Sequence, residues 1–111
     1  MRNLSSEFMA CRKAFVALGD ETRLHIITAL LESDPAGVRV GEITARTNLS
    51  RPAVSHHIKV LKDAGIIRMR REGTRNYYYL DYEVSELNKI ESLFAHIREL
   101  IHAAPDRSGD E

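Results

Sequence analysis

The segment Leu49–Leu61, LSRPAVSHHIKVL, predicts a helix with two unlike sides. Ser50 is a residue type that caps helix N-termini, and Pro52 suits the first turn, where a missing N–H costs nothing. At about 100° per residue, the side expected to face the core carries Val54, His57, Ile58 and Leu61. The opposite side is polar and mostly basic, and its residues include Arg51, Pro52, Ser55, His56 and Lys59.

The residues around this segment predict a helix-turn-helix followed by a β-hairpin. A short helix is expected over residues 41–47, and Asn48 ends it. Residues 66–70 and 76–80 have strand-forming composition, and the polar residues 71–75 between them predict a hairpin tip. In this winged arrangement the second helix of the pair enters the major groove of double-stranded DNA. We therefore expect the outward side of the helix to contact base edges and phosphates.

Helices at the two ends of the chain are predicted from apolar residues at steps of three and four. One continuous first helix is expected from Leu4 to Leu18, and a last helix from about Tyr82. Because an apolar stripe of the coiled-coil type needs a partner, we expect these helices to form a homodimer. The residues expected in the dimer interface are Phe8, Cys11, Phe15, Leu87, Ile90, Phe94, Ile97 and Ile101.

The region between the first helix and the helix-turn-helix predicts one more helix. Asp20 has the residue type of its N-cap, and the helix should end near Ser33. Residues 38–40 are expected to form a short strand. The predicted buried side of the helix consists of Leu24, Ile27, Leu30 and Leu31. The expected fold class is α+β, mainly α: a winged helix-turn-helix domain over residues 1–104, with dimerisation helices at both ends, and a flexible tail over residues 105–111.

Charge is distributed unevenly along a chain whose formal net charge is zero. Residues 39–75 carry nine Lys and Arg against three Asp and Glu, whereas residues 76–111 carry three against eight. A basic middle section indicates a surface that faces an anion. The hairpin holds Arg68, Arg70, Arg71 and Arg75, which would repel one another unless phosphates balanced them. The hairpin residues expected to contact DNA are Arg70, Arg71, Thr74 and Arg75.

Three consecutive tyrosines, Tyr77 to Tyr79, fit two interpretations. Aromatic residues are common in half-buried strands, which favours ordinary packing, and they also stack on the bases of single-stranded nucleic acid. We expect packing here.

Composition excludes other classes of protein. The longest apolar runs fall far short of the roughly 18 residues that a membrane span needs, so no membrane partner is expected. The first residues do not resemble a secretory signal, which predicts a cytoplasmic protein. Cys11 is the single cysteine, so the chain cannot form an internal disulfide.

Four stretches together resemble the ArsR/SmtB family of bacterial repressors. In order they are ALGDETRL at 17–24, LSRPAVSHHIKVL at 49–61, KDAGII at 62–67, and REG at 71–73 before YYYL at 77–80. The resemblance extends from about Phe8 to Phe94. It implies a winged-helix homodimer, joined through its first and last helices, that leaves its operator when an inducer binds. It also implies that Ser55 and His56 occupy the positions that read DNA.

The chain departs from this family at both of the family's metal sites. Residues 38–43, VRVGEI, lack the thiols that many relatives carry on the third helix. On the last helix, Glu83 and His96 are separated by two residues more than the family's motif has, which turns one side chain by about 200°. We therefore expect no metal and no cofactor at these sites. A site outside the family's pattern remains open, with His96, Glu99 or His102 as ligands.

Cys11 itself admits two interpretations. It is either a small buried apolar residue or a thiol that could form a disulfide with its symmetry mate and respond to oxidants. The inducer, if there is one, is not specified by the sequence.

Two functional classes compete with DNA binding. An enzyme would need a nucleophile, a base and an orienting group, and Ser55 and His57 diverge too far around the helix to form such a set, so no catalytic activity is expected. The stronger alternative is a winged-helix module that binds protein and uses the last helix as its docking surface. We favour a sequence-specific, DNA-binding transcriptional repressor.

Overall fold

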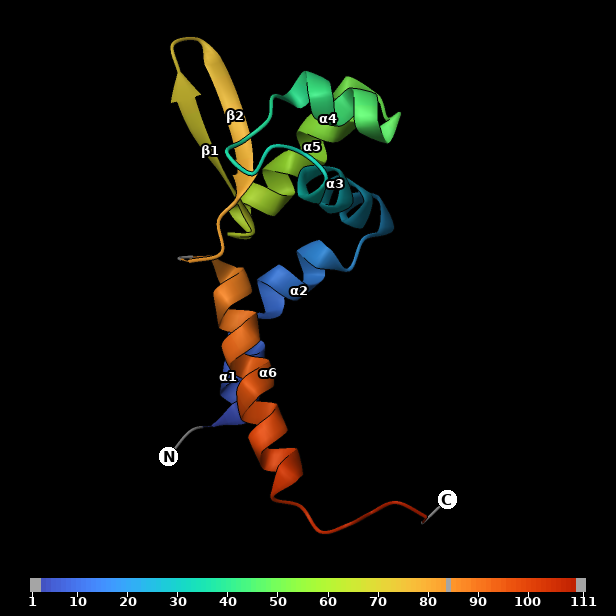
Figure 1. The fold of residues 1–111 in the computed structure, drawn as a ribbon, viewed down its shortest axis with the longest axis vertical. Helices are drawn as coiled ribbons and strands as arrows, with labels where there is room; N and C mark the ends of the chain where they lie inside the picture. Colours follow the sequence, from blue (N-terminus) through green and yellow to red (C-terminus); the bar gives the residue numbers. More distant parts are fainter. Residues whose placement is uncertain (1–2, 84, 110–111) are drawn as a thin grey trace.

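The computed structural model describes residues 3–83 and 85–109 and consists of a globular body and a narrow stalk (Figure 1). The body contains α3, α4, α5 and a two-stranded sheet, and α1 and α6 form the stalk. Within the described residues, no helix has both the length and the apolar character needed to cross a membrane. The elements in chain order are α1 Leu4–Ala10, α2 Arg12–Leu18, α3 Glu21–Leu31, α4 Val40–Thr47, α5 Arg51–Asp63, β1 Ile67–Glu72, β2 Arg75–Leu80 and α6 Glu86–His102.

The hydrophobic core lies inside the body, where α5 packs against α2, α3, α4 and β1. Removing apolar side chains from water is the main favourable contribution to folding. The largest fully buried side chains are those of Ile26, Ile43, Val54, Leu61, Ile66 and Ile67. In contrast, Leu93 is the one residue of α6 that is buried within the described chain. Leu87 and Ile90, near the beginning of α6, are partly buried and pack against the core, which joins the stalk to the body there.

Local capping residues set the ends of the helices around α5, as predicted. The Asp20 carboxylate accepts a hydrogen bond from the Arg23 N–H at 3.0 Å, and the Ser50 hydroxyl accepts one from the Ala53 N–H at 3.2 Å. Each bond satisfies a backbone donor that the first helical turn leaves without a partner. Asn48 ends α4 in the left-handed conformation, with φ of 55°. Asp20 thus sets the start of α3, and Asn48 and Ser50 bound the turn between α4 and α5.

The wing is an antiparallel pair in which Ile67 faces Leu80 and Glu72 faces Arg75. Its tip is the two residues Gly73 and Thr74, and Gly73 has a φ of 61°, a conformation that favours glycine. The strands are longer and the tip shorter than the sequence predicted. The strand predicted over residues 38–40 is reduced to a single bridge between Val38 and Tyr78, because α4 already begins at Val40.

The prediction of one continuous first helix was wrong. The chain turns at Cys11, whose φ of −93° and ψ of 4° lie outside the helical geometry of its neighbours. The turn lets the two halves pack on different partners: α1 lies against α6, whereas α2 packs on α3 and α5. A straight helix could not reach both. The turn at Cys11 therefore lets one stretch of chain connect the stalk to the body.

The predicted buried side of α3 was also partly wrong. Leu30 is buried and Ile27 packs at the edge of the core, as predicted, but Leu24 and Leu31 are exposed, and Ile26 and Ala29 are buried in their place. The segment is apolar on several sides, so periodicity alone selected the wrong set.

The last helix begins at Glu86 rather than near Tyr82, with Ser85 as its N-cap. The predicted tail is described only to Gly109, and residues 105–109 form neither helix nor strand. Residues 110 and 111 lie outside the described chain. The division into a domain over 1–104 and a tail remains a prediction.

Candidate nucleic-acid interface

The two sides of α5 separate as the sequence predicted. Val54, Ile58 and Leu61 are buried in the core. The other side is exposed and carries Arg51, Pro52, Ser55, His56 and Lys59. Lys59 lies 4.0 Å from Asp63, but both side chains are largely exposed, and such surface pairs contribute little. The Lys59 ammonium group therefore remains available to an anionic partner.

The four arginines of the wing fall into two groups. Arg71 and Arg75 are exposed beside the tip, where Thr74 is exposed as well, and the Arg71 Nε donates to the Gly73 carbonyl oxygen at 3.0 Å. Arg68 lies near the end of the wing opposite the tip, where it forms an ion pair with Asp81 at 3.2 Å. The tip therefore presents two cations that can reach a phosphate.

Arg70 is held by contacts within the chain. Its guanidinium lies 4.8 Å from the centre of the Tyr77 ring, 3.6 Å from the Glu72 carboxylate, and donates to the Ala36 carbonyl oxygen. The expectation that all four arginines need phosphates to relieve their repulsion was wrong for Arg68 and Arg70, because acidic and aromatic groups of the chain already balance them. A DNA contact by Arg70 remains a prediction, and the contacts of Arg70 within the chain argue against it.

A surface hollow of about 590 Å³ lies between the start of α4, the start of α5 and strand β2. Arg39 and Arg51 both line it, together with Tyr77 and two acidic residues, Asp34 and Glu42. Within the described part of the chain, neither guanidinium group makes a hydrogen bond or an ion pair. Sequence reasoning missed Arg39, because it precedes α4 as a loop residue and no motif marks it. Its position next to Arg51 adds a cation to the same side of the body.

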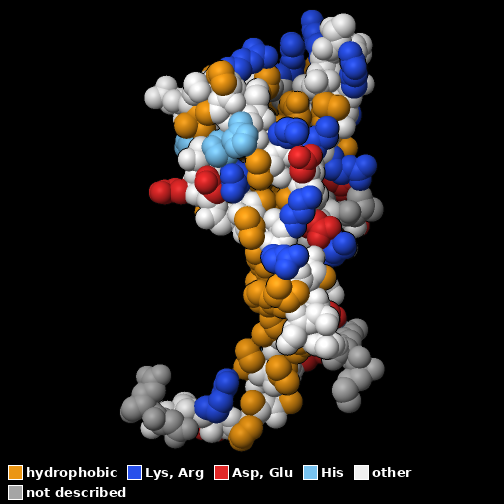
Figure 2. Space-filling model, turned by 180° about the vertical axis from the view of Figure 1, so that it is seen from behind, with side chains coloured by type: hydrophobic (Ala, Val, Ile, Leu, Met, Phe, Trp, Pro, Cys, Tyr) orange, Lys and Arg blue, Asp and Glu red, His pale blue; other side chains and the backbone are white. Residues whose placement is uncertain are grey.

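The space-filling view separates the basic and apolar surfaces. Figure 2 shows Lys and Arg side chains gathered over the globular body, and hydrophobic side chains along the narrow stalk.

The three tyrosines of β2 are half-buried, and Tyr78 packs against the core. Tyr77 lies beneath the Arg70 guanidinium. Both contacts favour packing over base stacking.

The stalk and the adjoining helix α2 together carry a set of exposed and half-buried apolar residues. Phe8 is 47% exposed and Phe94 is 50% exposed, whereas Phe15, Leu87, Ile90 and Ile97 are half-buried. Ile101 is exposed, as are three residues that sequence reasoning did not select, Met9, Val16 and Leu100. Cys11 differs from the other residues expected in a dimer interface, because it is 3% exposed within one chain and has almost no surface left for a partner.

Cys11 and His96 both have neighbours inside the stalk. Burial, and secondarily the Glu86 carboxylate, raises the pKa of the Cys11 thiol above its ordinary value. His96 Nδ1 lies 3.0 Å from the Glu7 carboxylate and joins α6 to α1. Among residues 3–83 and 85–109, no three His, Cys, Asp or Glu side chains converge in a way that could hold a metal ion.

A helix-turn-helix followed by a two-stranded wing defines a winged helix-turn-helix protein, and comparisons with known proteins agree. The family model described as "Bacterial regulatory protein, arsR family" matches residues 20–69. An HTH-type transcriptional regulator of Methanocaldococcus jannaschii is 42% identical over 77 residues, covering 68% of this chain and 84% of that protein. A cadmium resistance transcriptional regulatory protein CadC homolog of Staphylococcus aureus is 39% identical, covering 83% and 74%.

Solved structures have the same fold. An ArsR-like transcriptional regulator from Rhodococcus superposes with a TM-score of 0.67 at 26% identity, covering 86% of this chain and 90% of that chain. A homodimeric winged helix-turn-helix DNA-binding domain from Mycobacterium bovis gives a TM-score of 0.63 at 22% identity, covering 96% and 97%. The chain belongs to the ArsR family of bacterial regulatory proteins and is a transcriptional regulator.

Proposed function

We propose that this regulator is a homodimeric repressor that binds a palindromic operator in double-stranded DNA, in the cytoplasm, through α5 and the wing. The observation that carries the proposal is the division of α5 into two sides. Its apolar side is buried, while Arg51, Ser55, His56 and Lys59 are exposed. Side chains of these types donate to guanine, adenine and phosphate oxygens or nitrogens. The role of the chain is therefore binding, without a catalytic step.

The wing and the hollow beside α4 extend the proposed DNA contact. Arg71 and Arg75 at the wing tip, and Arg39 and Arg51 at the hollow, are exposed or line open surface. Phosphate contacts by such residues fix the position of a protein on the duplex, while residues in the major groove read the sequence. We assign the four arginines to phosphate contact, and Ser55 and His56 to base contact.

The stalk supports the homodimer. Its exposed Phe8, Phe94 and Ile101 form an apolar surface that a monomer would leave in water. The Mycobacterium bovis domain of the same fold is described as homodimeric. A twofold pair of α5 helices enters two half-sites about one helical turn, or 34 Å, apart. The operator is therefore expected to be an imperfect palindrome.

Release from the operator is proposed to follow a signal other than a metal ion at the family's sites. The segment 38–43 has no cysteine, and His96 is bonded to Glu7. A winged-helix module that binds protein instead of DNA is the competing function, and the basic exposed side of α5 argues against it.

Footprinting of the purified protein on the promoter region of its own gene tests the proposal. The expected result is a protected site containing an imperfect inverted repeat, with half-site centres about 34 Å apart. Absence of any protected site on that region or on a library of genomic fragments would contradict operator binding and favour the protein-binding module.

A further inference from the structure

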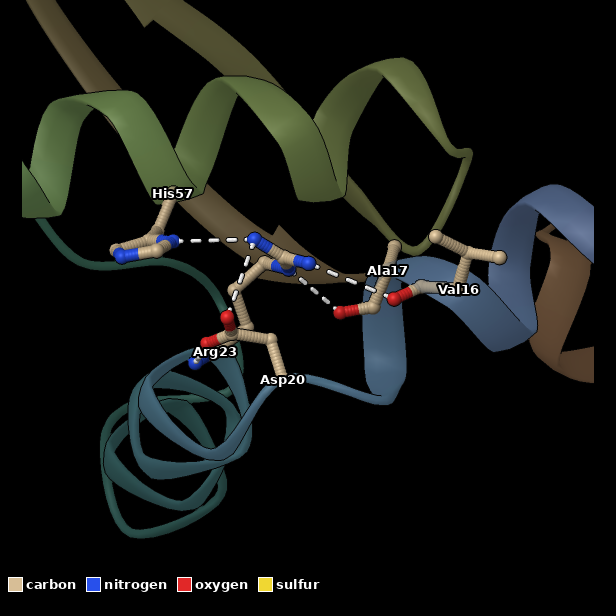
Figure 3. Close-up of polar contacts among 5 residues, drawn as sticks. All are labelled: Val16, Ala17, Asp20, Arg23 and His57. Carbon is tan, nitrogen blue, oxygen red and sulfur yellow. Dashed lines mark hydrogen bonds and ion pairs between the residues drawn. The ribbon is translucent and has the colours of Figure 1, made fainter.

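The guanidinium of Arg23, in the first turn of α3, joins three helices of the body (Figure 3). Its Nε donates to the Ala17 carbonyl oxygen at 2.6 Å, and its Nη2 donates to the Val16 carbonyl oxygen at 3.4 Å, both at the end of α2. Its Nη1 lies 3.3 Å from Nδ1 of His57 in α5 and 3.8 Å from the Asp20 carboxylate. The Arg23 side chain is only 14% exposed. We call this set of contacts the Arg23 joint.

The chemistry of arginine fixes the direction of the contact with His57. A guanidinium group carries five N–H donors, has no acceptor and stays charged in proteins. His57 Nδ1 can therefore only accept, which requires a neutral ring with its proton on Nε2. A protonated His57 has a donor N–H at both ring nitrogens and would place a second cation against the guanidinium.

The position of His57 connects this contact to DNA binding. His57 lies between His56, on the exposed side of α5, and Ile58, in the core. The apolar residues of α5 hold the helix in the body, and the Arg23 joint adds a directional contact to α2, the helix that leads to the stalk. Base contacts depend on placement within a fraction of an ångström, so a contact that sets the angle of α5 also sets its affinity for DNA.

We propose that Arg23 is a positioning residue that holds the DNA-reading helix α5 in register with α2 through neutral His57, and that protonation of His57 opens the joint and weakens operator binding. This inference rests on the proposed DNA-binding function. It makes the affinity of the repressor for its operator fall in mildly acidic solution.

The charged and titratable groups near the ring come from α3, its N-cap and α5 itself. From α3 and its cap, the ring faces the Arg23 guanidinium and, behind it, the Asp20 carboxylate, whose pKa is held below its usual range chiefly by the hydrogen bond from the Arg23 N–H. The α2 end contributes carbonyl oxygens that already accept from Arg23. Within α5, the His56 ring centre is 5.3 Å away. Of these groups, the Arg23 guanidinium is the one in direct contact with the ring, at 3.3 Å from Nδ1.

The tautomer of His57 gives a test that needs no variant and no DNA. Long-range ¹⁵N–¹H NMR of the wild-type protein near pH 8 distinguishes the two neutral forms of each histidine. We expect the Nε2–H form for His57, with Nδ1 unprotonated. The Nδ1–H form would overturn the joint, because that ring cannot accept from Arg23.

The pH profile of operator affinity tests the consequence. His57→Asn keeps an acceptor oxygen near the place of Nδ1 but does not titrate. Between about pH 8 and about pH 5.5, where histidine changes charge, wild-type affinity should fall relative to this variant by about fivefold, at the low end of typical coupling between sites. The matched control is His25→Asn, at an exposed position of α3, which should keep the wild-type profile.

The outcomes separate this inference from the proposed function. Parallel profiles for the wild type and His57→Asn would overturn the inference while leaving DNA binding intact. Failure of the wild type to bind any duplex contradicts the proposed function, and the NMR tautomer then decides the joint alone. If His57→Asn does not fold, as judged by circular dichroism, Arg23→Lys replaces it: a lysine cannot reach two carbonyls and the ring together, so its affinity should already be reduced near pH 8, and wild-type affinity would contradict the inference.

Discussion

The ring of Phe15 in α2 lies 6.1 Å, centre to centre, from the ring of Phe94 in α6. Phe8 of α1 stacks on Phe15 at 5.1 Å, so three aromatic rings connect the beginning of the chain with its end. Phe8 and Phe94 are nevertheless about half exposed. Aromatic pairs in this range contribute about 0.5–1.5 kcal/mol beyond their buried area. The cluster thus holds the stalk together and leaves an apolar surface for a second copy.

Phe94→Glu should convert the dimer to a monomer. A carboxylate at this position would face its own copy across a twofold axis in an apolar surface, which costs on the order of several kcal/mol. Light scattering at micromolar concentration measures the change, and Glu99→Lys, at an exposed position of α6 outside the apolar stripe, should remain dimeric. A wild-type protein that is already monomeric at that concentration would contradict the proposed interface.

Arg70→Ala and Arg75→Ala should affect different properties of the protein. Arg70 contacts Tyr77, Glu72 and Ala36, so its loss should lower the free energy of unfolding by about 1 kcal/mol. Arg75 is exposed at the wing tip, so its loss should leave stability unchanged and reduce the salt dependence of DNA binding by about one phosphate contact. Urea unfolding and DNA titrations at several salt concentrations measure the two quantities. Equal loss of stability in both variants would refute the division.

Much of the body could be predicted from the sequence because its signals are local. Ser50, Asp20 and Asn48 determine helix ends through bonds or dihedral angles that involve two or three neighbouring residues. The same holds for the two sides of α5, where Val54 and Ile58 differ clearly from the polar residues between them.

What could not be predicted depends on tertiary contacts. The turn at Cys11 has no Gly or Pro to mark it, and it exists because α1 and α2 pack on different helices. The Arg23 joint connects residues 34 positions apart in the chain. Its other acceptors are backbone carbonyl oxygens, which the pattern of side chains cannot reveal. The contact between the Arg70 guanidinium and the Tyr77 ring likewise depends on the register of the two wing strands, which places these residues opposite each other.

Ser55→Ala and His56→Ala should mainly erode the preference for the operator over other sequences. Both side chains lie on the exposed side of α5, where base contacts each contribute about 1–3 kcal/mol of discrimination. Affinities for the footprinted site and for a scrambled duplex of equal length provide the ratio. Arg71→Ala is the matched comparison, because a phosphate contact should lower both affinities alike. A loss of specificity in Arg71→Ala equal to that in His56→Ala would overturn the assignment.

Cys11 should react slowly in the folded protein. The thiolate is the reactive form, and burial both raises the pKa of this thiol and blocks access to it. The rate of modification by a thiol reagent near pH 8 should be at least about tenfold lower in the native protein than in urea. A native rate equal to that of the unfolded chain would return Cys11 to consideration as an oxidant sensor.

Operator affinity measured as a function of salt tests the central claim most directly. For a dimer that places Arg39, Arg51, Arg71 and Arg75 on phosphates, the logarithm of the affinity should fall linearly with the logarithm of salt concentration, with a slope of about −0.9 per contact. The footprinted duplex should also be bound at least about a thousandfold more tightly than a scrambled one. An affinity that is independent of salt and equal for both duplexes would contradict the account.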